Sequence, residues 1–151
     1  MKLFVVRLIA FFSLLTSFCG RAQIVKDKSK WTFEAKKKSG NRYDLVFHLK
    51  LPHGWRVDSK DDTMRYSRPS SFKFVKNSKV RLLGQIKELG KKERVVVDGW
   101  GESKFYKKLV DYVQAAMITG STKIEGTYKY QLVCDSIALQ STTKKFSFEI
   151  K

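Results

Sequence analysis

The sequence predicts an all-β domain built from packed sheets. Several segments alternate apolar and polar residues, which is the period of a strand with one buried face. Residues that favour turns separate these segments roughly every 8–12 positions. The 151 residues include only two prolines and no internal repeat, which agrees with a single domain. Together these observations favour an immunoglobulin-like β-sandwich.

The first two predicted strands form a hairpin. Trp31, Phe33 and Ala35 alternate with polar residues, and the run 43–51 repeats that alternation over a longer stretch. The apolar positions of the longer run are Tyr43, Leu45, Phe47, Leu49 and Leu51. Residues 39–41 (SGN) lie between the two runs and are a turn signal, so we expect the runs to pair.

The middle of the chain is expected to contain short strands and one long loop. Residues 52–54 (PHG) end the second strand, and residues 58–68 are polar without periodicity, which predicts a loop. The segment 72–74 alternates again. Residues 80–89 are apolar enough for a strand, although Gly84 interrupts it.

The last third of the chain continues the β pattern. Residues 95–97 are three valines, and the Asp-Gly pair at 98–99 ends them. The segment 105–117 fits either one face of a helix or a strand, and the β pattern around it favours a strand. Alternation returns at 124–132 and 146–150. The chain is thus expected to hold about eight or nine strands.

The N-terminus has the features of a secretory signal peptide. Lys2 and Arg7 supply positive charge before a mostly apolar stretch that is too short to span a membrane. Cleavage after Ala22 follows from the small residues near it, so residues 1–22 are predicted to be the signal and 23–151 the mature domain. We therefore expect a periplasmic or secreted protein. A lipid anchor at Cys19 is disfavoured because the residue before it is the large Phe18.

The protein is strongly basic. It holds 31 lysines and arginines against 14 acidic residues, a net charge of +17, and loss of the three basic residues in 1–22 leaves +14. This charge favours acidic partners, such as anionic envelope lipid or an acidic protein surface, or it serves only as a solubilising coat. Nucleic acid is a common partner of basic domains, but an exported protein rarely meets it, so we expect none.

The predicted mature domain keeps a single cysteine, Cys134. Exported proteins occupy compartments where disulfides persist, yet one cysteine cannot form an internal bridge. Cys134 is therefore buried and inert, free and reactive, or paired with another molecule. Its reactivity depends on exposure and neighbouring charge.

Seven short segments together resemble a known family. They are 30–33 (KWTF), 43–49, 53–55 (HGW), 69–74 (PSSFKF), 98–106 (DGWGESKFY), 128–135 (YKYQLVCD) and 146–150 (FSFEI). In this order and spacing they resemble the N-terminal periplasmic domain of the thiol:disulfide interchange protein DsbD, in the form common in stand-alone envelope proteins. The resemblance implies an immunoglobulin-like fold. It also implies electron transfer through a cysteine pair to other periplasmic thiol proteins.

The resemblance assigns candidate site residues and also reveals a gap. Cys134 matches the first cysteine of the family's pair, whereas the second would fall at about Leu139 or Gln140, and neither is a thiol. The resemblance places Asp98, Gly99, Trp100 and Gly101 in the loop that caps the redox site. A dithiol cycle needs a resolving thiol, so this domain cannot complete one alone.

The remaining candidates carry little chemistry. Trp100 is either a lid over Cys134 or a partner anchor, or else it is tucked into the edge of the sandwich. His48 points outward from its strand and His53 lies in a turn, so neither predicts a zinc site. The acidic pair 61–62 lacks calcium-loop spacing and is expected to be a solvated turn. With no second cysteine and no clustered acids, we expect no metal site. No phosphate-binding glycine loop occurs, and we expect no cofactor.

Three functional hypotheses follow. The first is a docking module with an incomplete redox pair, which contacts a thioredoxin-like protein or a membrane thiol-disulfide protein through the face near Trp100 and Cys134. The second is a thiol-disulfide exchange component in which Cys134 reacts with a partner thiol. The third is a basic module that binds the envelope surface. Enzymatic activity is the weaker expectation.

Overall fold

The computed structural model describes residues 25–151, so the predicted signal peptide lies outside the described residues. Within this range the chain forms ten strands and no helix. Accordingly, the described part contains no helix long and apolar enough to cross a membrane. The expected all-β class is confirmed, with one or two strands more than the sequence predicted.

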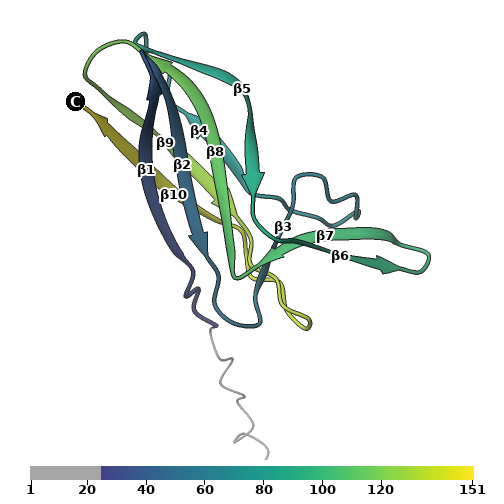
Figure 1. Ribbon diagram of the computed structural model, residues 1–151. Helices are drawn as coiled ribbons and strands as arrows, with labels where there is room; N and C mark the ends of the chain where they lie inside the picture. The colour runs from purple at the N-terminus through teal and green to yellow at the C-terminus, as the bar shows by residue number, and fades with distance from the viewer. Residues whose placement is uncertain (1–24) are drawn as a thin grey trace, which may run out of the picture.

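The strands form three antiparallel sheets (Figure 1). In chain order the strands are β1 (Lys30–Ser39), β2 (Arg42–Lys50), β3 (Arg56–Asp58), β4 (Ser71–Phe74), β5 (Val80–Leu89), β6 (Lys92–Val97), β7 (Gly101–Lys107), β8 (Leu109–Ile118), β9 (Thr122–Tyr130) and β10 (Thr142–Ile150). The first sheet has the order β1-β2-β8-β5, the second β10-β9-β4 and the third β3-β7-β6.

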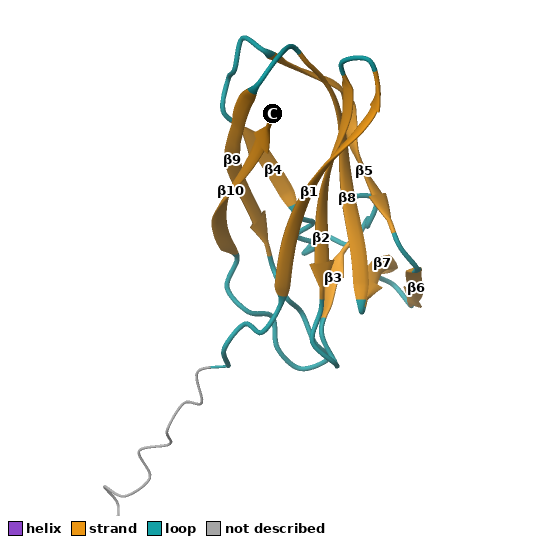
Figure 2. Ribbon diagram, turned by 60° about the vertical axis from the view of Figure 1, so that its left-hand side comes forward, coloured by secondary structure: helices purple, strands orange, loops and turns teal. Residues whose placement is uncertain are grey.

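The first two sheets face each other as an immunoglobulin-like sandwich, seen edge-on in Figure 2. The expected hairpin is present: β1 pairs with β2 around residues 40–41, and Phe33 lies opposite Phe47 in the register. Every second residue of β8 is buried, from Val110 to Ile118, because the strand alternates between the core and solvent. The period-two pattern therefore sets which side chains enter the core.

Aromatic rings fill the space between the two sheets. Phe47 is fully buried at the centre, with ring centroids 4.6 Å from Phe72 and 4.8 Å from Phe146. Trp31 closes one end of the cluster and lies 4.5 Å from Tyr128. Rings of this size bury large apolar areas, so this cluster contributes strongly to the hydrophobic stabilisation of the sandwich.

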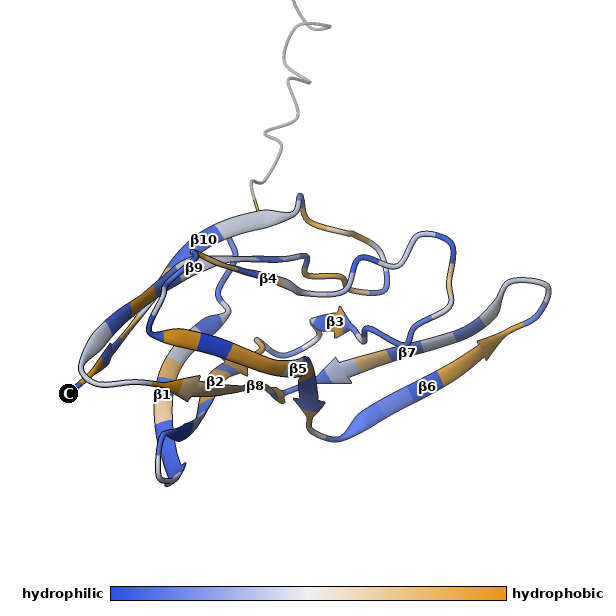
Figure 3. Cartoon of the chain, turned by 90° about the horizontal axis from the view of Figure 1, so that it is seen from above, coloured by the Kyte–Doolittle hydropathy of each residue, from blue (hydrophilic) through white to orange (hydrophobic). Residues whose placement is uncertain are grey.

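The third sheet projects from one end of the sandwich as an arm (Figures 1 and 3). β6 and β7 form its hairpin, and β3 joins β7 on the side nearest the sandwich. The segment 105–117, expected as one strand, is two strands that meet at Lys108, which has a φ of 69°. This corner lets the chain leave the arm at Tyr106 and enter the core sheet at Val110, both of which are buried.

Candidate functional site

Cys134 lies in a small hairpin that follows β9. Val133 and Ala138 form an antiparallel bridge, and the Cys134 amide donates to the Ile137 carbonyl at 2.8 Å. Val133 also exchanges two backbone hydrogen bonds with Arg56 of β3, which fixes the hairpin against the third sheet. The Cys134 side chain is partly buried and lies outside the aromatic core. The thiol is therefore not sealed between the sheets.

The position where the family pattern expects a second cysteine does not lie opposite Cys134. Ile137 takes that place across the turn, and its side chain is exposed. Leu139 instead donates its amide to the Leu132 carbonyl at 2.9 Å and packs against the core. Within residues 25–151, Cys134 is the only cysteine, so this hairpin carries a single sulfur.

A hollow of about 380 Å³ lies beside the Cys134 hairpin. Its lining comes from three parts of the chain: the end of β3 and the loop 59–70, strand β7, and the chain on both sides of the cysteine. The lining residues are Arg56, Asp58, Asp62, Met64, Tyr66, Ser67, Arg68, Ser103, Gln131, Val133 and Ala138. Two buried polar atoms of this lining, Nε of Arg56 and Oγ of Ser67, find no hydrogen-bond partner among the described residues. Both atoms are themselves shielded from solvent, so they are unsatisfied interior groups in the wall of the hollow.

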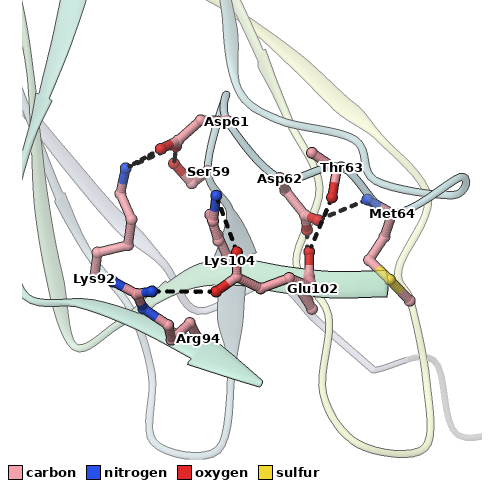
Figure 4. Close-up of polar contacts among 10 residues, drawn as sticks. Ser59, Asp61, Asp62, Thr63, Met64, Lys92, Arg94, Glu102 and Lys104 are labelled. Carbon is pink, nitrogen blue, oxygen red and sulfur yellow. Dashed lines mark hydrogen bonds and ion pairs between the residues drawn. The ribbon is translucent and has the colours of Figure 1, made fainter. Parts of the chain in front are cut away.

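A polar cluster holds the loop 59–70 against the arm (Figure 4). The Ser59 hydroxyl is fully buried and lies within hydrogen-bonding distance of the carboxylates of Asp61 and, at 2.6 Å, Glu88. Lys92 of β6 donates to both oxygens of Asp61 at 2.7 Å. This lysine holds the pKa of the Asp61 carboxyl well below its usual range, and the Ser59 hydroxyl adds to the effect. The Asp61–Lys92 pair is therefore ionised at neutral pH. The expected acidic turn is present and Asp61 is exposed, and its ion pair with Lys92 also anchors the loop to the arm.

The far part of the loop reaches along β7 toward the arm tip. Asp62 accepts from the Met64 amide at 2.9 Å, and the Thr63 hydroxyl donates to the Glu102 carbonyl at 3.3 Å (Figure 4). A Cβ built on Gly101 would meet the Met64 sulfur at 3.9 Å, so Met64 lies against the backbone of the tip. Met64 thereby connects the hollow with the arm.

The predicted cap residues form the tip of the β6–β7 hairpin. Gly99 and Gly101 have φ values of 75° and 106°, a region that favours glycine, and the Trp100 amide donates to the Val97 carbonyl at 2.9 Å. Trp100 is 62% exposed, so the alternative that it is tucked into the sandwich edge is wrong. Aromatic residues are enriched at protein–protein interfaces, so an exposed tryptophan at this tip is a candidate contact residue.

The tip and the cysteine hairpin are bridged by the loop. At the tip, Gly101 lies against Thr63 and Met64 of the loop. Met64 and Tyr66 of the same loop line the hollow beside the Cys134 hairpin. A capping role of the tip stays a prediction. The sequence predicts 58–68 only as a polar loop, although its two apolar side chains, Met64 and Tyr66, were a signal that the loop has a contact to make.

The two histidines take no part in this surface. His48 lies on the outer face of β2, as expected, with Nδ1 2.8 Å from Oδ1 of Asp111 and Nε2 3.5 Å from Oε2 of Glu34. His53 lines a separate hollow with Trp55. The described residues contain no group of three or more potential ligands that could hold a metal ion.

Two solved structures with a similar fold are N-terminal domains of bacterial proteins. The N-terminal periplasmic domain of ScsB from Proteus mirabilis matches with a TM-score of 0.55 and 11% identity over 83% of this chain, which spans only 51% of that structure. The N-terminal domain of DsbD from Neisseria meningitidis in the reduced form matches with a TM-score of 0.52 and 10% identity over 80% of this chain and 90% of its own. These likenesses show the fold alone. No family model and no curated protein matches the sequence.

Proposed function

We propose that this chain is an exported docking domain of the DsbD N-terminal type, with an incomplete redox pair, that binds a thioredoxin-like protein. The docking surface consists of the 133–138 hairpin, the adjoining hollow and the arm tip at 98–101. The observation that carries the proposal is the exposed Trp100 at the end of a fixed arm that Met64 links to the hollow beside Cys134.

A single sulfur supports docking better than turnover. Attack of the Cys134 thiolate on a partner disulfide would form one S–S bond, break another and release a partner thiol that takes up a proton. The Cys134 sulfur is oxidised and the leaving sulfur is reduced. Release of this mixed disulfide then needs a thiol from outside the domain, because residues 25–151 offer no second cysteine.

The docking proposal is tested by titrating a purified periplasmic thioredoxin-fold domain into this protein by calorimetry. Aromatic anchors near an interface centre commonly contribute about 2 kcal/mol or more, so Trp100→Ala should weaken binding about 30-fold. Leu109→Ala is the matched control, because this side chain is 59% exposed and lies on β8, away from the proposed surface. Equal affinities for both variants would contradict the docking surface.

The second candidate function is thiol exchange through Cys134, which its partly exposed position favours. The test mixes the folded protein with the disulfide form of the same thioredoxin-fold domain and resolves the products on a non-reducing gel, with Cys134→Ser as control. A covalent adduct that persists until glutathione is added supports exchange. Absence of an adduct, together with resistance of Cys134 to a thiol-alkylating reagent, would exclude it.

A further inference from the structure

β6 is an edge strand whose outer side has no partner among residues 25–151. It pairs with β7 on one side only and forms the margin of the third sheet. Val95, Val96 and Val97 are consecutive and exposed, with Val96 reaching 72%. Figure 3 shows this apolar stretch at the outer end of the projecting arm. Such an edge presents free backbone groups beside apolar side chains, which is the usual template for pairing with another strand.

The two faces of β6 differ in character. The register places Arg94 beside Lys104 and Val96 beside Glu102 on one face. On the other face, Val95 lies beside Ser103 and Val97 beside Gly101. The second face is therefore a shallow apolar track with small neighbours. The first face carries Lys92, Arg94 and Lys104 at its start. Asp61 pairs with Lys92, and Glu102 pairs with Arg94 and Lys104, so this face keeps an excess of one positive charge.

Charge determines what kind of strand this edge can accept. The chain carries +17 overall, so two copies repel each other, which disfavours their pairing along β6. Lys91 and Arg94 near the base of the arm instead complement carboxylates. Both are exposed, Arg94 by 77% even though it lies 3.4 Å from Glu102, whereas Lys92 is held by Asp61. We infer that the free edge of β6 binds an extended acidic segment of a partner protein as an added strand. This binding goes beyond the proposed docking to a thioredoxin-like protein and does not depend on it.

Strand addition explains why both faces of the valine stretch are exposed. An added strand places alternate side chains on the two faces, so apolar residues extend the track of Val95 and Val97 while acidic residues meet Arg94. The main-chain hydrogen bonds hold the segment along the edge. A partner that contacted side chains alone would cover one face only. It would leave either Val96, or Val95 and Val97, exposed to water.

The probe is an eight-residue peptide of alternating valine and glutamate, with a lysine-for-glutamate version as the charge control. Addition of the acidic peptide should slow amide hydrogen exchange in residues 92–97, and the basic peptide should bind at least about tenfold more weakly. Two acidic peptides N-methylated on alternate amides test the backbone contact. At least one of them should lose binding, because only alternate amides of an added strand point toward β6 and form its hydrogen bonds.

Variants locate the site on β6. Val96→Ala and Arg94→Gln should each weaken peptide binding, whereas Val75→Ala, at a valine that is 62% exposed beside β4, should leave it unchanged. Unaltered exchange in 92–97, full binding by both methylated peptides, or dimerisation through β6 in sedimentation experiments would each overturn the inference. Peptide binding without docking of the thioredoxin-fold domain would leave it standing and refute only the proposed function.

Discussion

Replacement of Gly126 by alanine tests how tightly the second sheet is built. Gly126 lies in β9 opposite Phe146 of β10 and Phe74 of β4. A Cβ at this position would lie 2.2 Å from the Lys73 carbonyl oxygen and 2.4 Å from Cζ of the Phe146 ring. Carbon atoms in contact normally sit about 3.5–4.0 Å apart, so these neighbours must move by about 1 Å or more.

Neither neighbour can move freely. The Phe146 ring packs against both Phe47 and Phe148, with centroids at 4.8 and 5.7 Å. The Lys73 carbonyl belongs to the backbone of β4, whose Phe72 packs against the same core. Overpacking in such a site costs about 1–3 kcal/mol, and we expect the upper end here. For a domain of this size that loss lowers Tm by roughly 10 °C.

Urea unfolding followed by tryptophan fluorescence measures the effect, because Trp31 sits in the aromatic cluster. Gly84→Ala is the matched control, since Gly84 has a φ of 64° and no atom within 4 Å of a built Cβ. Its cost comes from backbone strain alone, about 1–2 kcal/mol. A Gly126→Ala protein as stable as the Gly84→Ala protein would refute the packing argument.

Three further predictions concern the core, the loop anchor and acid stability. Phe47→Ala removes a fully buried ring and should cost about 3–5 kcal/mol in urea unfolding; a loss below about 2 kcal/mol would contradict its central place. A double-mutant cycle of Asp61→Asn and Lys92→Gln should give a coupling free energy of unfolding of about 0.5–1 kcal/mol at pH 7. The value is modest because both side chains are partly exposed. Zero coupling would mean that the pair does not hold the loop. Burial raises the pKa of Asp27, but hydrogen bonds, chiefly from the Tyr130 hydroxyl, outweigh burial and leave that pKa lowered. Asp27 therefore stabilises the fold above about pH 3.8, and this effect is lost as the pH falls through the lower pKa of the folded state. Asp27→Asn should make the free energy of unfolding fall less steeply at acid pH. An unchanged pH dependence would contradict this.

Periodicity was enough to predict the sandwich. The alternation in 43–51 predicts a strand with one buried face, and Phe47 is indeed fully buried in β2. The break at Lys108 was not predicted, because a lysine with positive φ carries no sequence signal comparable to glycine. The arm was missed for the same reason, since it arises where β7 turns away from β8.

The site was less predictable than the fold. Cys134 and Trp100 were singled out, and the structure places one beside the hollow and the other at the arm tip. The contribution of Ser59 and Asp61 could not be read from a polar run, because their partners, Glu88 and Lys92, are distant in sequence. Side-chain networks that join distant strands depend on the register of the finished sheets, which local pattern does not encode.

The single-residue corner at Lys108 couples the orientation of the arm to the sandwich. Tyr106 and Val110, on either side of it, are both 1% exposed, so a swing of the arm would pull a large side chain out of the interior. The β6–β7 hairpin is thus held in one direction before any partner arrives. A rigid projection of this kind loses little conformational freedom on association, which favours recognition by even a small contact area.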